Sequence, residues 1–450
     1  MHDGSFNALR DLKADYVRYV PWFPYPKLAV AELDAPDAQK TSWDFSLIDP
    51  MTLDFFEATK GHSTIMNFST IPQWMFKTEQ RVPYPADPNE VGWGYGGGTE
   101  LRDTTLQEVA GYYSRLVSWY TKGGFTDERG KVHTSGYHYE LPYWEVLNEP
   151  DLEHNFTPEA YTKVYDAIVT AIHKVSPKTK FVGLGLAYER NPKYFEYFLN
   201  PANHKPGIPI DMISYHCYAN ANPNQKLEDY QYTLFDKADL FLNVVRYVEH
   251  IRKRLSPSTR TTINELGTFV NNEMRDQPIP QEYWNLSASV YAYFFIGLTK
   301  EGIDVIGESQ LVGFKTQYPD VSMINPDNAK PNARLWVLKM LHDNFSAGDI
   351  LVNTTVGADN GEDIVAQGFI TGGNKDAAGG TAGASAGGTK KILILNKRNK
   401  TISVKLPAGF KGAAVSTVEM SSGDNAPNTK VLDADTIEMS PYAVSVITLK

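Results

Sequence analysis

Residues 141–151 read Leu-Pro-Tyr-Trp-Glu-Val-Leu-Asn-Glu-Pro-Asp, an apolar and aromatic run that stops abruptly at Asn-Glu-Pro. A short run of this composition is typical of a buried strand. Pro150 cannot continue that strand because it has no N–H group to donate to a sheet. Glu149 is therefore predicted at the carboxyl end of a buried strand, the end at which parallel sheets and barrels collect their catalytic side chains.

A second stretch has the same form. Residues 260–267, Arg-Thr-Thr-Ile-Asn-Glu-Leu-Gly, are a β-branched run that ends in a carboxylate, Glu265, and a glycine. Two glutamates at two strand ends can face each other across the mouth of a barrel. Cleavage of a glycosidic bond needs such a pair, one carboxylic acid and one carboxylate. The alternative is that each glutamate is an ordinary surface carboxylate, the commonest situation for this side chain.

The run from Trp144 to Asp151 resembles the acid/base strand of the clan of retaining glycosidases built on (β/α)8 barrels. Within that clan the chain is most similar to glycoside hydrolase family 39, the family of β-xylosidases and α-L-iduronidases, from about Phe6 to about His342. The resemblance implies that Glu149 is the general acid/base and Glu265 the nucleophile. It also implies that Asn148 hydrogen-bonds the 2-hydroxyl of the sugar, a contact that its place beside the acid favours.

Two further strand ends supply candidate substrate contacts. The strand at 210–218 ends in Ser-x-His-x-Tyr, which resembles the site strand of the family. His216 and Tyr218 share one face of a period-two strand, so both are predicted to reach the mouth. We expect His216 to bind a sugar hydroxyl or to position Glu265, or else to be a satisfied core histidine. Trp74 follows the strand at 64–69 and is either a wall for the sugar or a core tryptophan under a loop.

Arg18 stands alone in an apolar strand, where an unpaired guanidinium would be costly, so it is predicted to have an acidic partner. The resemblance suggests a carboxylate at the mouth, Glu265 or Glu145. Glu145 shares strand parity with Glu149 and is expected to point into the barrel. A purely structural Arg18–Glu145 pair and a role for Arg18 in tuning Glu265 are compatible alternatives.

The alternation of strands and helices up to about residue 345 predicts an α/β fold, a (β/α)8 TIM barrel, in residues 1–345. The first barrel strand is apparently missing or replaced, because the first predicted strand, at 15–22, resembles the second strand of the family. After residue 345 only strands are predicted, which indicates an antiparallel β-sandwich in residues 346–450. Its stretch 372–389 is rich in Gly and Ala and is expected to be a mobile loop. At the eighth strand end, Gly307-Glu308-Ser309-Gln310 stands where family members usually carry a tryptophan.

Composition excludes several classes of function. The net charge of −10 argues against a nucleic-acid partner, which would need a basic surface. No histidine or cysteine spacing indicates a metal site, no cofactor is expected, and Cys217, the only cysteine, permits no intrachain disulfide. The longest apolar run, 288–298, is too short to span a bilayer. The partner expected is a glycoside or oligosaccharide, and the sequence leaves the oligomeric state open.

The sequence gives fewer indications of the substrate and of the cellular compartment than of the fold. The segment after His216 carries no Lys or Arg to bind a uronic acid, which favours an exo-acting β-glycosidase for a neutral glycone unless Arg102 or Arg190 supplies the charge. An endo-acting β-glycanase, an α-L-iduronidase-like enzyme and an inactive carbohydrate-binding protein are the alternatives. The first residues lack the features of a signal peptide. Secretion or a lysosome-like location is therefore expected only if an N-terminal segment is missing, and a cytoplasmic location otherwise.

Overall fold

The computed structural model describes residues 3–21, 24–78, 81–95, 97–221, 224–270, 279–312, 319–325, 329–372 and 388–449. Seven strands form one nearly closed parallel sheet in the order β1-β2-β5-β6-β7-β8-β9. These strands are β1 (Tyr16–Tyr19), β2 (Ser63–Met66), β5 (Tyr143–Glu145), β6 (Lys180–Leu186), β7 (Met212–Asn220), β8 (Arg260–Phe269) and β9 (Val305–Ile306). They confirm the seven predicted barrel strands, and no eighth strand of this sheet is recorded among the described residues.

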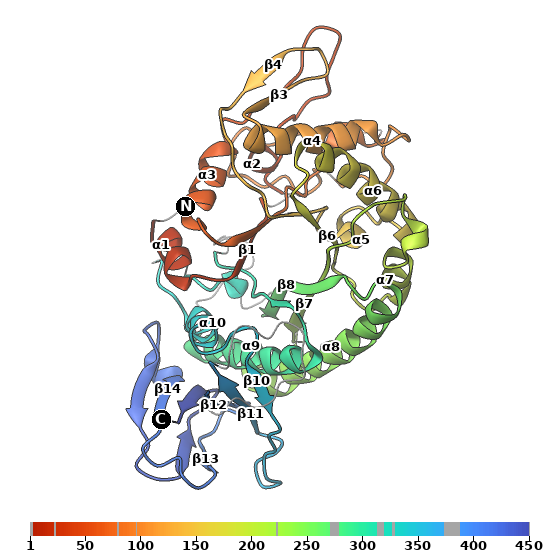
Figure 1. The fold of residues 1–450 in the computed structure, drawn as a ribbon. Helices are drawn as coiled ribbons and strands as arrows, with labels where there is room; N and C mark the ends of the chain where they lie inside the picture. Colours follow the sequence, from red (N-terminus) through yellow and green to blue (C-terminus); the bar gives the residue numbers. More distant parts are fainter. Residues whose placement is uncertain are drawn as a thin grey trace. The chain divides into compact units, whose positions relative to one another are not determined.

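Helices alternate with these strands along the chain (Figure 1). They are α1 (Asp3–Leu12), α2 (Pro26–Ala29), α3 (Asp49–Ala58), α4 (Gln107–Thr121), α5 (Pro150–Glu153), α6 (Pro158–Val175), α7 (Pro192–Phe198), α8 (Leu227–Leu255), α9 (Gln281–Glu301) and α10 (Ala333–Asn344). The strand–helix order confirms the barrel class.

Local sequence explains why α6 begins and what it buries. The Thr157 hydroxyl accepts a hydrogen bond from the N–H of Ala160, and Pro158 occupies the first helical position, where no N–H is needed. Its apolar positions at helical spacing include Tyr161 and Ile168, which are fully buried. The Tyr161 hydroxyl also donates to the carbonyl of Val146, so this helix fixes the chain just after β5.

Two compact units are recognised within the chain. The first comprises residues 13–216 and 246–264 and includes the hairpin β3 (Gly124–Thr126) and β4 (Val132–Thr134), which was expected from its turn sequence. The second comprises residues 2–12, 217–245 and 265–450. The division at residue 345 stays a prediction, because these units are assembled from other segments.

The C-terminal strands form the predicted antiparallel sandwich. A six-stranded sheet has the order β10-β11-β12-β17-β14-β15, and β13 pairs with β16 in a two-stranded sheet. Ile394 and Ile447 from the larger sheet and Val404 and Ile437 from the smaller one belong to one buried cluster. The bounds are β10 (Ile350–Val352), β11 (Ile364–Thr371), β12 (Thr389–Asn396), β13 (Ile402–Lys405), β14 (Ala414–Val418), β15 (Asn428–Val431), β16 (Thr436–Met439) and β17 (Val444–Thr448). Residues 373–387 of the predicted mobile loop lie outside the described residues.

Candidate active site

Glu149 lies on a tight turn rather than on the strand itself. β5 ends at Glu145, four residues earlier than the predicted strand end. Leu147 and Glu149 then take left-handed backbone angles, with φ of 67° and 41°. Such angles cost a non-glycine residue on the order of 1–3 kcal/mol and concentrate at functional sites. Pro150 opens α5 directly afterwards, so the side chain of Glu149 is fixed at a sharp break in the chain.

A bulge in β6 holds this turn in place. The pairing of β6 with β7 shifts between Leu184 and Leu186, which leaves Gly185 as the extra residue. Gly185 has a φ of 59°, a value that favours glycine. Its carbonyl accepts a hydrogen bond of 2.8 Å from the N–H of Glu149. The bulge therefore sets the position of the candidate acid/base.

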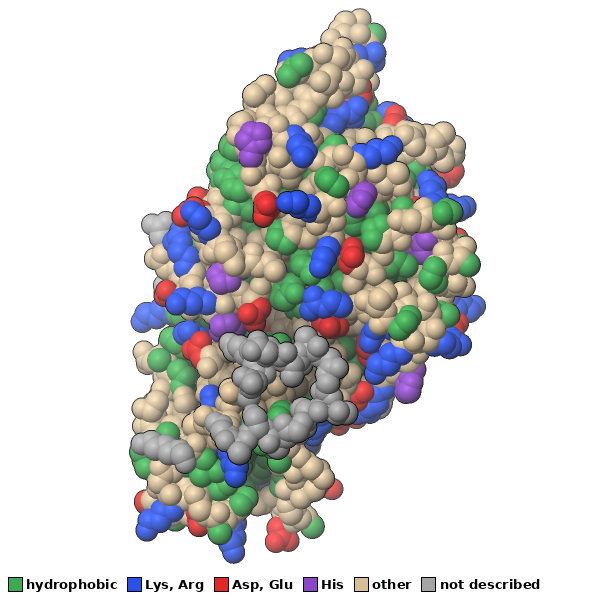
Figure 2. All heavy atoms as spheres, in the orientation of Figure 1, with side chains coloured by type: hydrophobic (Ala, Val, Ile, Leu, Met, Phe, Trp, Pro, Cys, Tyr) green, Lys and Arg blue, Asp and Glu red, His purple; other side chains and the backbone are tan. Residues whose placement is uncertain are grey.

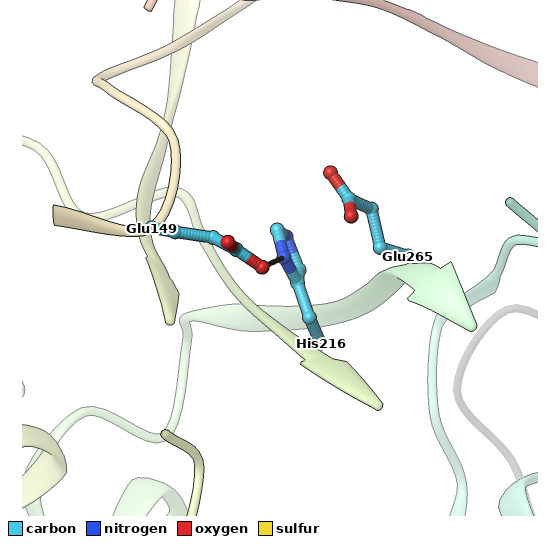
Figure 3. A group of neighbouring side chains, drawn as sticks. All are labelled: Glu149, His216 and Glu265. Carbon is cyan, nitrogen blue, oxygen red and sulfur yellow. Dashed lines mark hydrogen bonds and ion pairs between the residues drawn. The ribbon is translucent and has the colours of Figure 1, made fainter. Parts of the chain in front are cut away.

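His216 is the partner of the Glu149 side chain. Its Nδ1 lies 2.8 Å from Oε1 of Glu149 (Figure 3). The histidine side chain is 1% exposed, whereas that of Glu149 is 18% exposed and so remains accessible. The prediction placed His216 at the mouth, and the hydrogen bond given by the structure goes to the acid/base candidate.

Glu265 receives its hydrogen bond from a tyrosine. It lies within β8, and the hydroxyl of Tyr218 donates to its Oε2 at 2.8 Å. The Tyr218 ring stacks on Phe269 with ring centres 4.4 Å apart, which restrains the ring and thereby the direction of the hydroxyl. Both candidate glutamates are therefore oriented by residues of β7.

Glu149, His216 and Glu265 form one cluster. One oxygen of each glutamate and one ring nitrogen of the histidine all lie within 4.8 Å of one another, and Figure 3 draws the three side chains. Two carboxylates and an imidazole at this spacing are also a set of ligands that can bind a divalent cation. The cluster can therefore perform acid–base and nucleophilic chemistry or hold a metal ion.

Strand β7 has one hydrogen-bonding residue for each of three glutamates. Ser214 donates to Glu145, His216 bonds Glu149, and Tyr218 donates to Glu265. The spacing of two places the three side chains on the same face of the strand. The predicted common face of His216 and Tyr218 thus extends to Ser214, which the sequence analysis did not select.

Glu145 is the buried acid of this region. Arg18 donates from Nε at 2.5 Å, so the partner of Arg18 given by the structure is Glu145, one of its two predicted partners. Asn67, Ser214 and Asn264 donate the remaining hydrogen bonds to its carboxylate. Burial alone would raise the pKa of Glu145, but the Arg18 charge and these donors hold that pKa below its ordinary value. Glu145 is therefore an ionised structural acid.

Asn148 links this buried pair to the turn. Its Oδ1 accepts from Arg18 at 2.6 Å and its Nδ2 donates to Glu153 at 2.9 Å. Its role toward a sugar 2-hydroxyl stays a prediction. The residues that the sequence analysis missed here, Asn67, Ser214 and Asn264, carried a usable signal, because each lies on or next to a strand of the barrel.

Trp74 is not an open wall for a sugar. It is 3% exposed, its indole N–H donates to the carbonyl of Glu32 at 2.9 Å, and the Arg102 guanidinium lies 4.5 Å from the centre of its ring. A ring that stacks on a sugar needs an accessible face. The prediction of a sugar wall is therefore corrected to its alternative, a core tryptophan.

Figure 2 shows positive and negative side chains interspersed over the face it presents. In the part of the chain that is described, no helix combines the length and the apolar character required to cross a membrane.

Comparison with known proteins finds a family match for the central segment. Residues 130–281 match the family described as Glycosyl hydrolases family 39. No curated protein matches the sequence. Solved structures match the fold over nearly the whole chain at low identity, which supports the fold alone.

Three of these structures are glycosidases. A GH39 β-xylosidase from Caulobacter crescentus has a TM-score of 0.57 at 15% identity, covering 100% of this chain and 93% of its own. A GH51 arabinofuranosidase from Xanthomonas axonopodis pv. citri has a TM-score of 0.62 at 13% identity, covering 99% and 89%. A GH30 endoxylanase from Clostridium papyrosolvens has a TM-score of 0.58 at 13% identity, covering 100% and 93%. The chain is thus a glycoside hydrolase whose residues 130–281, the segment that carries both candidate glutamates, match family 39.

Proposed function

We propose that this glycoside hydrolase cleaves its substrate by double displacement with retention of configuration, with Glu265 as nucleophile and Glu149 as acid/base. The observation that carries the proposal is the short separation of the two carboxylates, with one oxygen of each within 4.8 Å. Retaining enzymes hold their carboxyl groups about 5–5.5 Å apart, whereas inverting enzymes need about 6.5–9.5 Å to admit a water molecule, and a nearest-oxygen distance within 4.8 Å favours the shorter spacing.

The two glutamates have surroundings that suit different roles. Glu265 accepts a hydrogen bond from the Tyr218 hydroxyl, and a donor of this kind favours the ionised form that a nucleophile requires. Glu149 lies against a histidine ring nitrogen, which can take up or return a proton as the acid becomes a base in the second step. In the first step Glu265 attacks the anomeric carbon while Glu149 protonates the departing oxygen. In the second, Glu149 deprotonates the water that releases the sugar.

A neutral glycone and exo action are the proposed specificity. A uronic acid requires a cationic group to bind its carboxylate. Arg102 is held by both oxygens of Glu108 at 2.8 and 2.7 Å, and Arg190 pairs with Glu189. Both arginines that could overturn the preference for a neutral sugar therefore have an acidic partner within the protein. A β-xyloside is the first substrate to test.

The test uses aryl β-xyloside, β-galactoside, β-glucoside, α-L-arabinoside and α-L-iduronide, with xylan as the polymer. We expect one aryl glycoside to be cleaved, and Glu265→Ala and Glu149→Ala each to lower that activity by several orders of magnitude. The matched control is Glu159→Ala, an exposed glutamate in the first turn of α6, which should leave activity unchanged. Azide should rescue both site variants, giving an inverted glycosyl azide with Glu265→Ala and a retained one with Glu149→Ala.

The outcomes separate the alternatives. Cleavage of xylan without cleavage of any aryl glycoside would establish an endo-acting enzyme. Binding of sugar by folded protein without turnover would establish an inactive carbohydrate-binding protein. Loss of activity on dialysis against EDTA, restored by a divalent cation, would assign the Glu149–His216–Glu265 cluster to a metal instead. Wild-type rates from either alanine variant would remove that glutamate from the mechanism.

A further inference from the structure

Ser309, three residues after β9, is linked to the candidate nucleophile Glu265 through the side chain of Tyr218. Ser309 is 7% exposed, and its Oγ lies 2.6 Å from the hydroxyl oxygen of Tyr218. The same Tyr218 hydroxyl lies 2.8 Å from Oε2 of Glu265. Ser309, Tyr218 and Glu265 therefore form a continuous chain of hydrogen bonds.

The direction of these hydrogen bonds follows from the number of protons that each group can donate. A phenol has one O–H and can donate only once, and an ionised carboxylate can only accept. The Tyr218 hydroxyl is placed to donate to Oγ of Ser309 or to Oε2 of Glu265. When Glu265 is ionised the carboxylate takes this single proton, and the hydroxyl of Ser309 is then the group that donates to the phenol oxygen. Hydrogen bonds in series polarise one another, so the donation by Ser309 strengthens the one that reaches the carboxylate.

The Ser309 backbone is fixed by a buried arginine. The Ser309 N–H donates to the carbonyl of Leu266 at 3.0 Å, and its own carbonyl accepts from Nη2 of Arg334. Arg334 also donates to the carbonyl of Val321 and to Glu308, at 2.9 Å for the latter, and both charged side chains of this pair are 0% exposed. A buried guanidinium whose donors are engaged in this way is a rigid support.

Glycine at position 267 permits this arrangement. Gly267 lies on β8 two residues after Glu265, and a Cβ atom there would stand 2.8 Å from Nη2 of Arg334 and 3.2 Å from the carbonyl oxygen of Ser309. The first distance is too short for any real side chain. The strand that carries Glu265 is thus packed directly against the residues that hold Ser309.

We propose that Ser309 is a positioning residue for Glu265, which it orients through its hydrogen bond with the Tyr218 hydroxyl. The proposal rests on the proposed role of Glu265 as nucleophile. Ser309 contacts no substrate in this scheme and acts only through the tyrosine.

The test is a double-mutant cycle followed as a pH profile. Ser309→Ala, Tyr218→Phe and the double variant are compared for kcat/KM on the aryl glycoside that the wild type cleaves. The acidic limb of this profile reports the group that must be ionised in the free enzyme. We expect Ser309→Ala to lower kcat/KM roughly tenfold, in keeping with the loss of one hydrogen bond, and to move the acidic limb to higher pH.

In the Tyr218→Phe background, Ser309→Ala should change neither kcat/KM nor the position of the acidic limb any further, because the tyrosine hydroxyl that Ser309 contacts is absent. The control is Ser289→Ala, which removes a buried serine hydroxyl that donates to the carbonyl of Asn396. It should leave the acidic limb in place.

Additive effects in the cycle, or an unmoved acidic limb in Ser309→Ala, would overturn the role of Ser309. The proposed function fails by a different result, namely full activity of Glu265→Ala. If Glu265→Ala is inactive and Ser309→Ala behaves like Ser289→Ala, the role of Glu265 as nucleophile stands. Only the positioning role of Ser309 is then rejected.

Discussion

Replacing Arg18 by methionine should destabilise the protein in a pH-dependent way. The guanidinium and the Glu145 carboxylate are 9% and 0% exposed, so the variant would leave a buried carboxylate without its opposite charge. Removing one partner of such a pair costs about 3–5 kcal/mol. Asn67, Ser214 and Asn264 still donate to Glu145 in the variant, which places the expected loss near the lower end, about 3 kcal/mol at about pH 7.5.

The pH dependence follows because the pKa of Glu145 is shifted in opposite directions in the wild type and in Arg18→Met. In the wild type the pKa of Glu145 is lowered, so its contribution to stability is present above the ordinary value of 4.5 and is lost only as the pH falls through the lower folded value. In Arg18→Met the charge is gone and burial would raise the pKa of Glu145 instead. The variant should then lose stability as the pH rises above the unfolded value, so its deficit relative to the wild type is larger at about pH 7.5 than at about pH 5.

The assay is urea unfolding followed by tryptophan fluorescence at both pH values. Arg115→Met is the matched control, because Arg115 pairs with Glu128 at 2.5 Å but the two side chains are 24% and 27% exposed. That variant should lose less than about 1 kcal/mol at either pH. An equal deficit for Arg18→Met at both pH values, or one no larger than that of the control, would refute the assignment of Glu145 as an ionised acid neutralised by Arg18.

Three further predictions follow from the buried side chains. Trp74→Ala should lower the free energy of unfolding by about 3–5 kcal/mol and leave KM unchanged, and a raised KM at unchanged stability would restore Trp74 as a sugar platform. His216→Ala should lower kcat/KM at least about tenfold and displace the basic limb of its pH profile, and a profile identical to the wild type would separate His216 from the acid/base. Burial raises the pKa of Glu308 to about 7, against the opposing charge of Arg334, so wild-type stability should fall as the pH rises from about 4.5 through about 7. Glu308→Gln should remove that part of the pH dependence of the melting temperature, and an unchanged dependence would contradict it.

Barrel strands such as β6 were predictable because they are buried on both faces. β6 is a continuous run of apolar residues and glycine that is buried from Phe181 to Leu186, and such runs stand out in the sequence. β15 carried no such signal, since all four of its residues are exposed, and it was missed. A strand that pairs only through its backbone leaves no apolar pattern to find.

The site was predictable in its residue types and less so in its contacts. Glu149 and Glu265 followed from the ends of an apolar run and a β-branched run, which local sequence encodes. The place where β5 ends did not, because the left-handed angles at Leu147 and Glu149 depend on the bulge in the neighbouring strand. The choice of Glu145 as a partner for Arg18 likewise depends on which strands become neighbours.

The bulge at Gly185 has a consequence for how this protein can change in evolution. Ser214 lies opposite Leu184 before the bulge and Tyr215 lies opposite Leu186 beyond it, so deleting Gly185 would leave the register of β7 unchanged. The deletion would instead remove the carbonyl that accepts the N–H of Glu149. The turn that carries the candidate acid/base would then lose its anchor on the neighbouring strand. Insertions and deletions should accordingly be tolerated in loops such as the β3–β4 hairpin and excluded from the bulge in β6.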